Sequence, residues 1–297
     1  MRKILLCSDL DRTLIPNGEQ AESPQARELF ALLAARREIR LAYVSGRHAQ
    51  LVREAIAEYA LPEPDYVIGD VGTTLYRIER EALRTPGGKP WQLDKKWQQE
   101  IGRDWHDCNR DDVVGLVAGI DGIDGMGLRL QEEAKQNDYK VSYYTELDLD
   151  IKSVHDHVAA FLAERGILST VIWSRDDAAK CGLLDILPRR ANKLQAIRFL
   201  MQEENIAETN AVFAGDSGND LDVLTSGLQA ILVRNSAADV RKMALEELAK
   251  KGWTDYLYIA KGGLYGMNGN YAAGVLEGLV HFFPETAEWL KSIPRLR

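Results

Sequence analysis

The sequence predicts an α/β fold in which a parallel sheet forms the core and an α+β domain is inserted between its two halves. Two observations support this prediction. Near both ends of the 297-residue chain, short apolar runs alternate with helical stretches, as they do in parallel α/β proteins. Between about residues 82 and 187 this alternation stops, which indicates a separate structural unit.

The first half of the predicted core contains three strands and two helices. Strands are expected at 3–8, 39–47 and 64–73, and helices at 23–38 and 48–60. Ser23 is expected to cap the first of these helices, with Pro24 at the first helical position, because both residue types favour those places. The resulting strand-helix rhythm predicts a parallel sheet covered on both faces.

The rhythm resumes in the last third of the chain. Helices are expected at 192–205, 236–252 and 271–283, and strands at 210–215, 228–235 and 256–260. Between the two halves, "TPGGKP" at 85–90 predicts a turn. It is followed by a helical stretch at 91–120, a strand pair at 127–133 and 139–146, a helix near 150–165, and strands at 169–174 and 183–187.

Composition excludes several functional classes. The formal net charge is -8 and no dense Lys/Arg stripe is present, which argues against nucleic-acid binding. Asp9 comes too early for a signal peptide, and no apolar run approaches the ~18 residues of a membrane span. Three scattered cysteines form no disulfide framework. A cytoplasmic protein without a membrane or nucleic-acid partner is therefore expected.

Three predicted strands end in polar residues, and ligands of open parallel sheets bind at the carboxyl ends of the strands. In chain order these residues are Asp9 and Asp11; Ser45, Gly46 and Arg47; and Asp216, Asn219 and Asp220. The four carboxylates would repel one another strongly at the dielectric of a protein interior. Because a hard divalent cation removes that repulsion, and the ligands are all oxygens, the set points to Mg²⁺.

Four segments resemble, in order, the motifs of the haloacid dehalogenase (HAD) superfamily of phosphatases: "DLDRT", "VSGR", Lys193 within "RANKLQAIRFL", and "GDSGND". The resemblance implies a Rossmann-like HAD core domain at 1–81 and 188–297. Residues 82–187 then form a cap domain that sets substrate specificity. The insertion falls between Arg47 and Lys193, which is the position of the larger cap type of this superfamily.

The resemblance also implies catalytic roles. Asp9 would be the nucleophile that forms an aspartyl-phosphate, and Asp11 the general acid that protonates the leaving alkoxide and then activates water. Ser45 and Lys193 would hold the transferring phosphoryl oxygens. Asp216 would bind Mg²⁺ together with the Asp9 side chain and the Asp11 backbone carbonyl.

Asp220 would support the metal shell or orient Lys193. A soluble phosphatase or phosphomutase is expected from Asp11, because haloacid dehalogenases need no acid at this place and the ion-pumping relatives carry Thr there.

A closer resemblance, to sucrose-6-phosphate phosphatases and related sugar phosphatases, rests on seven segments in order. These are "DLDRTLI", "YVSGR", "VGTTLY", "YKVSYY", "NKLQAIRFL", "GDSGND" and "AAGVLEGLVHF". The resemblance implies a small phosphorylated sugar as the substrate, with sucrose 6-phosphate expected first. Contacts to sugar hydroxyls or phosphate are implied for Gly46, Arg47, Lys140 and Asn219.

Several alternatives remain open at this point. Mannosylfructose phosphate, a glucosyl- or mannosyl-3-phosphoglycerate, or another glycosyl phosphate would fit the same motifs. A phosphomutase would retain the phosphoryl group on a product sugar. A non-catalytic partner domain of a glycosyltransferase would have no use for clustered carboxylates, and association of an active enzyme with a sugar-phosphate synthase is compatible with the resemblance.

Overall fold

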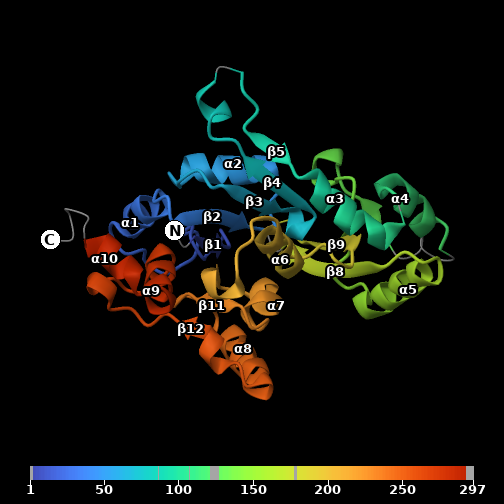
Figure 1. Cartoon of the computed structure of the whole chain (residues 1–297). Helices are drawn as coiled ribbons and strands as arrows, with labels where there is room; N and C mark the ends of the chain where they lie inside the picture. The colour runs from blue at the N-terminus through green and yellow to red at the C-terminus, as the bar shows by residue number, and fades with distance from the viewer. Residues whose placement is uncertain (1–2, 86, 107, 121–126, 177–178, 292–297) are drawn as a thin grey trace. The chain divides into compact units, whose positions relative to one another are not determined.

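The computed structural model describes residues 3–85, 87–106, 108–120, 127–176 and 179–291 (Figure 1). By its internal contacts the chain divides into two compact units. The core unit comprises Met1–Leu93 and Lys193–Arg297, and the inserted unit comprises Asp94–Asn192.

The boundaries of these units differ from the expected insertion at 82–187. Residues up to Leu93 belong to the core unit, because Trp91–Leu93 pairs with another strand of its sheet. The chain ends 1–2 and 292–297 of the predicted core, and Pro86 of the predicted turn, lie outside the described residues.

Within the described residues, the core unit contains one eight-stranded sheet in the order β12-β11-β10-β1-β2-β3-β4-β5. Its strands are β1 (Ile4–Ser8), β2 (Ile39–Val44), β3 (Tyr66–Gly69), β4 (Thr74–Ile78), β5 (Trp91–Leu93), β10 (Ala211–Gly215), β11 (Gln229–Leu232) and β12 (Leu257–Ile259). The six strands from β12 to β3 are parallel, whereas β4 and β5 are antiparallel to their neighbours. The predicted α/β class with a mostly parallel sheet is confirmed.

The central strands determine where the polar loops lie. Every residue of β1 and β10 is buried, as expected for parallel strands that are covered on both faces. The register pairs Ser8 of β1 with Tyr43 of β2 and with Ala214 of β10. The carboxyl ends of these three strands are therefore level, and the residues that follow them meet at one edge of the sheet.

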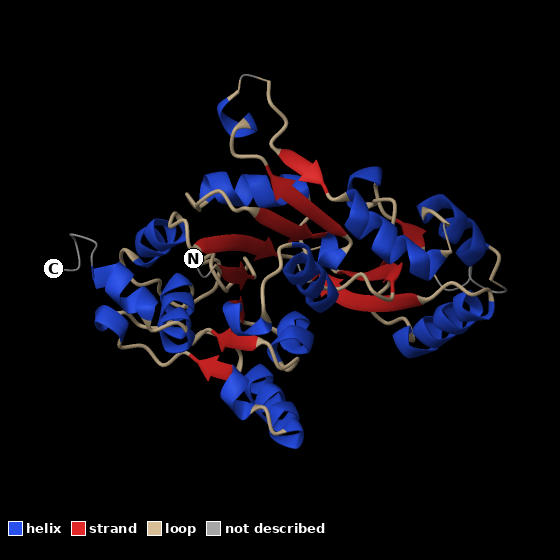
Figure 2. Ribbon diagram, in the orientation of Figure 1, coloured by secondary structure: helices blue, strands red, loops and turns tan. Residues whose placement is uncertain are grey.

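The helices of the core unit flank this sheet (Figure 2). They are α1 (Ala26–Ala34), α2 (Ala49–Glu58), α6 (Lys193–Glu203), α7 (Leu221–Leu224), α8 (Ala238–Lys251), α9 (Ala272–Phe282) and α10 (Glu285–Lys291). A cluster of buried side chains joins α1, α9 and α10 to the sheet, and it includes Phe30, Tyr43, Leu276 and Leu290. None of the helices in the described part of the chain has the length and apolar character needed to cross a membrane.

Three local predictions need correction. Ser23 does not cap α1, which begins at Ala26; its hydroxyl instead accepts a hydrogen bond from the backbone N–H of Asn268 at 2.8 Å. Strands β4 and β5 were not expected, since the three residues of β5 fall within the stretch predicted as helix and become a strand only by pairing. Helix α10 was also not expected, and it packs against α1 and α9.

The inserted unit is an antiparallel sheet with helices. Its strands, in the order β6-β7-β9-β8, are β6 (Arg129–Leu130), β7 (Val141–Thr145), β9 (Cys181–Pro188) and β8 (Ser169–Asp176). Its α-helices among the described residues are α3 (Lys95–Gly102), α4 (Arg110–Ala118) and α5 (Ile151–Glu164). Val113, Val158 and Leu184 lie in one buried cluster with Trp105, so this unit has a hydrophobic core of its own.

The contact between α9 and β11 provides a test of the packing. A Cβ atom added at Gly278 of α9 would lie only 2.4 Å from Cγ1 of the buried residue Ile231. We expect Gly278→Val to lower the free energy of unfolding by about 3 kcal/mol, because a close-packed core has no room for the added side chain. Urea unfolding followed by circular dichroism measures this change.

Gly115→Ala in α4 is the matched control, since a Cβ at this helical glycine would meet nothing within 4 Å. It should leave stability unchanged or raise it by up to about 1 kcal/mol. An unaltered unfolding midpoint for Gly278→Val would contradict the close approach of α9 to the sheet.

Candidate active site

The candidate site lies where β1 and β10 end. Asp9 directly follows β1, and its backbone N–H donates to the carbonyl of Ala214 in β10 at 2.9 Å. Asp216 directly follows β10. The pairing of the two strands thus continues into the first residue of the polar loop, which holds the backbone of Asp9 beside the end of β10.

Lys193 joins the carboxylates of this site. It is the first residue of α6, and its Nζ lies 3.0 Å from Oδ1 of Asp9 and 2.7 Å from Oδ1 of Asp220. All three side chains are at least nine-tenths buried, so the ion pairs are little screened by solvent. Residues that are 184 positions apart in sequence are thereby brought into direct contact.

Asp220 uses both of its carboxylate oxygens within the protein. Oδ1 binds Lys193, while Oδ2 accepts hydrogen bonds from the backbone N–H groups of Asp216 at 3.1 Å and Ser217 at 3.2 Å. The Ser217 hydroxyl lies 3.3 Å from the same Oδ2. The Asp220 carboxylate packs directly against Gly215, where an added Cβ atom would lie only 2.6 Å from Oδ2. A residue with a side chain would therefore clash at this position.

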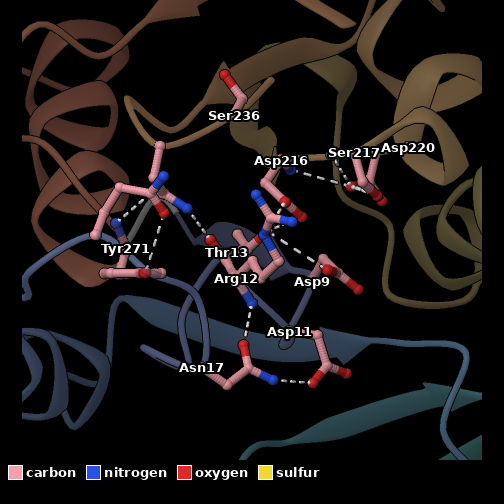
Figure 3. A network of polar contacts seen from close by, with 12 residues as sticks. Asp9, Asp11, Arg12, Thr13, Asn17, Asp216, Ser217, Asp220, Ser236 and Tyr271 are labelled. Atoms are coloured by element: carbon pink, nitrogen blue, oxygen red, sulfur yellow. Dashed lines mark hydrogen bonds and ion pairs between the residues drawn. The ribbon is translucent and has the colours of Figure 1, made fainter. Parts of the chain in front are cut away.

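Two neighbours of these carboxylates were quoted in the motif "DLDRT" but received no role from the sequence. The buried Thr13 Oγ1 lies 3.2 Å from Oδ1 of Asp216 and 3.4 Å from Oδ2 of Asp9, so its single proton can serve only one of them at a time. Nε of the half-exposed Arg12 lies 3.5 Å from Oδ2 of Asp216 (Figure 3). Their position directly after Asp11 in the same turn was the signal available in the sequence.

The cluster carries an excess of negative charge. Burial, together with the charges of Asp220 and Asp216, raises the pKa of Asp9 to about 7 even though Lys193 opposes this shift. Burial and the charge of Asp220 raise the pKa of Asp216 to about 6. The pKa of Lys193 is raised as well, because the attraction of Asp220 and Asp9 outweighs its own desolvation. Lys193 and the half-exposed Arg12 therefore do not fully compensate three buried carboxylates.

This charge pattern fits a divalent cation. Carboxylate oxygens of Asp9, Asp216 and Asp220 lie within 4.8 Å of one another. Oδ1 of Asp220 pairs with Lys193 and its Oδ2 accepts from two backbone N–H groups. Asp9 and Asp216 each keep an oxygen whose only partner among the described residues is Thr13 or Arg12, at 3.2–3.5 Å, so they are the carboxylates best suited to bind the ion directly. An all-oxygen site of this kind suits Mg²⁺, whose positive charge would offset the uncompensated carboxylates.

Asp11 is in a different environment from Asp9. Its carboxylate is held by Arg47, with Nε 2.8 Å from Oδ2 and Nη2 2.6 Å from Oδ1, and it also accepts a 2.6 Å hydrogen bond from the amide of Asn17. Burial alone would raise the pKa of Asp11, but the hydrogen bonds and charge of Arg47 and the Asn17 hydrogen bond lower it below its ordinary value. The Asp11 carboxyl group is therefore bound by Arg47 and Asn17, an arrangement that the sequence did not predict.

The remaining predicted residues lie as follows. Ser45 directly follows β2 and is buried. Its backbone N–H donates to the carbonyl of Ile68 at 2.8 Å, and its hydroxyl accepts from the backbone N–H of Arg47 at 3.2 Å. Gly46 is exposed beside it, and Asn219 is exposed in the loop between Asp216 and Asp220.

Lys140 belongs to the inserted unit, immediately before β7, and is buried there. The structure thus brings four predicted residues, Asp9, Lys193, Asp216 and Asp220, into one cluster and joins Asp11 to Arg47 in a second.

Comparison with known proteins identifies the family. The family model for sucrose-6F-phosphate phosphohydrolase matches residues 2–283. A protein of Nitrosococcus oceani described as a HAD-like hydrolase is 54% identical over 98% of this chain and 75% of its own length. The mannosylfructose-phosphate phosphatase of Agrobacterium fabrum is 28% identical over 94% of this chain and 96% of its own length.

Among solved structures, the sucrose-phosphatase of Synechocystis in complex with sucrose and phosphate aligns with a TM-score of 0.67 and 30% identity. The alignment covers 95% of this chain and 98% of that one. The match of the family model over nearly the whole chain decides the assignment. This chain belongs to the sucrose-6F-phosphate phosphohydrolase family of HAD-like phosphatases.

Proposed function

We propose that this protein is a Mg²⁺-dependent phosphatase that hydrolyses a sugar phosphate to the free sugar and phosphate. Sucrose 6-phosphate is the substrate that we propose first. The observation that carries the proposal is the buried cluster in which Lys193 bridges Asp9 and Asp220 beside Asp216. A buried, uncompensated carboxylate cluster is unfavourable for folding by itself, so its presence favours catalysis over a scaffolding role.

In the proposed reaction, Asp9 attacks phosphorus, a new P–O bond forms to its carboxylate, and the P–O bond to the sugar breaks. Asp11 takes up a proton from solvent once Arg47 has turned to the substrate, gives it to the departing sugar oxygen, and later takes a proton from the water that hydrolyses the aspartyl-phosphate. Lys193 and the Ser45 hydroxyl hold the phosphoryl oxygens, while Asp220 keeps Lys193 in place. A bound Mg²⁺ would be held by Asp9, Asp216 and the backbone carbonyl of Asp11, and it would supply positive charge to the phosphoryl group.

The proposed substrate class rests on both units. We assign the inserted unit, Asp94–Asn192, as the cap that selects the substrate, with Lys140 among its contacts and with Gly46, Arg47 and Asn219 as contacts from the core unit. A cap would favour a small metabolite over a macromolecule, because it would exclude bulky substrates and water.

Sucrose 6-phosphate is supported by the family model and by the sucrose and phosphate bound in the Synechocystis relative. Mannosylfructose phosphate is the second candidate, because the Agrobacterium phosphatase aligns over nearly the whole of both chains. Phosphomutase activity and association with a synthase remain predictions from the sequence.

A panel of sugar phosphates tests the substrate. We expect release of inorganic phosphate to be fastest, by kcat/KM, with sucrose 6-phosphate, followed by mannosylfructose phosphate. The panel also includes glucosyl- and mannosyl-3-phosphoglycerate and glucose 6-phosphate. Preference for a phosphoglycerate would show that the substrate is a glycosyl phosphoglycerate and not sucrose 6-phosphate. Transfer of the phosphoryl group to a second sugar without phosphate release would identify a mutase.

Removal of the proposed nucleophile is the second test. Asp9→Asn should reduce phosphate release by about 10³-fold or more, because an amide cannot form the aspartyl-phosphate. The exposed Asp222→Asn in α7 is the matched control and should retain wild-type turnover. Substantial turnover by Asp9→Asn would eliminate this residue as the nucleophile.

Metal removal is expected to act on stability as well as on activity. Because the pKa of Asp9 is raised to about 7 and that of Asp216 to about 6, the folded metal-free protein holds protons that the unfolded chain has lost. Its free energy of unfolding should therefore fall as the pH rises between about 4 and 7. Chelation by EDTA should stop turnover, and Mg²⁺ should restore it.

Differential scanning calorimetry measures the stability effect. Mg²⁺ should raise Tm more near pH 8 than near pH 5, since protons compete for the same carboxylates at low pH. Without metal, Asp9→Asn should melt at a higher temperature than the wild type near pH 8, and the difference should shrink near pH 5. An equal effect of Mg²⁺ at both pH values would argue against binding at this cluster.

A further inference from the structure

Asn17, a residue with no assigned role, connects the Asp11 carboxylate to the backbone of the same loop. Its amide Nδ2 donates to Oδ1 of Asp11 at 2.6 Å, and its Oδ1 accepts from the backbone N–H of Arg12 at 2.8 Å (Figure 3). Asparagine is suited to this bridge, because its carboxamide offers a donor and an acceptor on one rigid plane. The same bridge could not be made by a residue with a donor or an acceptor alone.

The backbone of Arg12, to which Asn17 is hydrogen-bonded, is held in place by other contacts. Arg12 has a φ of 58°, a left-handed conformation that a non-glycine residue keeps only when its surroundings enforce it. The side-chain amide of the buried Asn235 donates to the carbonyl of Arg12 at 2.5 Å. The Asn17 backbone N–H also donates to the carbonyl of Ile15 at 2.9 Å. The backbones of Arg12 and Asn17 are therefore both held by hydrogen bonds.

Arg47 holds the Asp11 carboxylate from a different element, the loop after β2. Its guanidinium binds both oxygens, so Oδ1 receives two hydrogen bonds and Oδ2 receives one. Under the proposed function Arg47 contacts the substrate, and a shift of its guanidinium toward the substrate would free Oδ2 of Asp11. The hydrogen bond from Asn17 to Oδ1 can persist at that moment, because it depends only on the loop that carries Asp11.

We propose that Asn17 is the positioning residue of the general acid: it holds Oδ1 of Asp11 so that Oδ2 delivers its proton to the sugar oxygen once Arg47 has engaged the substrate. This inference rests on the proposed function, in which the P–O bond to the sugar breaks as the bond to Asp9 forms. The proton passes from Asp11 to the sugar oxygen in the same step.

Two substitutions separate this role from support of the loop. Asn17→Ala removes both hydrogen bonds, whereas Asn17→Asp keeps an acceptor for the Arg12 N–H and loses the donor to Asp11. Asn17→Asp also sets a second carboxylate beside Oδ1 of Asp11, so loss of activity in this variant alone does not separate the two roles. If Asn17 only supports the loop, each variant should lose activity equally with good and poor leaving groups. If it positions Asp11, both variants should be impaired mainly with the poor leaving group.

The leaving group provides the readout. With the sugar phosphate that the substrate panel shows to be best, kcat/KM should fall about tenfold in both variants, because a sugar alkoxide needs a well-placed acid. With p-nitrophenyl phosphate, whose leaving group departs as a stable anion, kcat/KM should stay within about twofold of wild type. The exposed Glu19→Ala, in the same loop, is the control and should leave both values unchanged.

Wild-type kcat/KM for Asn17→Asp with the sugar phosphate would overturn the inference, and so would an equal loss with both substrates in the two variants.

Asp11→Asn in the same assays distinguishes failure of this inference from failure of the proposed function. If Asp11→Asn slows the sugar phosphate far more than the aryl phosphate and the Asn17 variants do not, only the role of Asn17 is wrong. If Asp11→Asn shows no such preference, the general-acid assignment itself is wrong. Thermal unfolding midpoints within a few degrees of wild type establish that the variants are folded.

Discussion

The ion pairs of Lys193 with Asp9 and Asp220 are the interactions on which the active-site edge of the core unit depends. They tie the start of α6 to the ends of β1 and β10, across three segments that are distant in sequence. Several local features follow from them. Gly215 has to be a glycine because the Asp220 carboxylate packs against it. The second oxygen of Asp220 accepts hydrogen bonds from the backbone N–H groups of Asp216 and Ser217. Buried carboxylates are stable only with counter-charge, and Lys193 together with Arg12 supplies less positive charge than the three carboxylates carry.

The two aspartates of "DLDRT" have opposite electrostatic environments. Asp9 is buried among like charges, which raises its pKa, whereas Asp11 is held by Arg47 and Asn17, which lower its pKa. The first environment favours binding of a cation. The second holds an ionised carboxylate in a fixed orientation. Under the proposed function, a substrate group that engages Arg47 would change that environment directly, so one guanidinium would link recognition of the substrate to control of Asp11.

The two units differ in how far the sequence predicted them. The parallel strands of the core unit appear as short buried apolar runs, and the sequence located all six of them. Strands β4 and β5 were missed. The edge strand β5 has only three residues, which is too short for a periodic signal of its own. For the inserted unit the sequence indicated helices and strand pairs, but its boundaries differ from 82–187 because edge pairing assigns Leu93 to the core sheet.

The sequence by itself determined the α/β class and the chemistry available at three strand ends, because strand periodicity and the order of the motifs are local properties of the chain. Only the tertiary structure decided how those groups are paired. It showed that Asp220 has both oxygens occupied, that Thr13 stands between Asp9 and Asp216, and that Asp11 is bound by Arg47, 36 residues away. Such contacts depend on strand register and on the direction of each side chain across the sheet edge. No local pattern encodes distances of about 3 Å between residues that are distant in sequence.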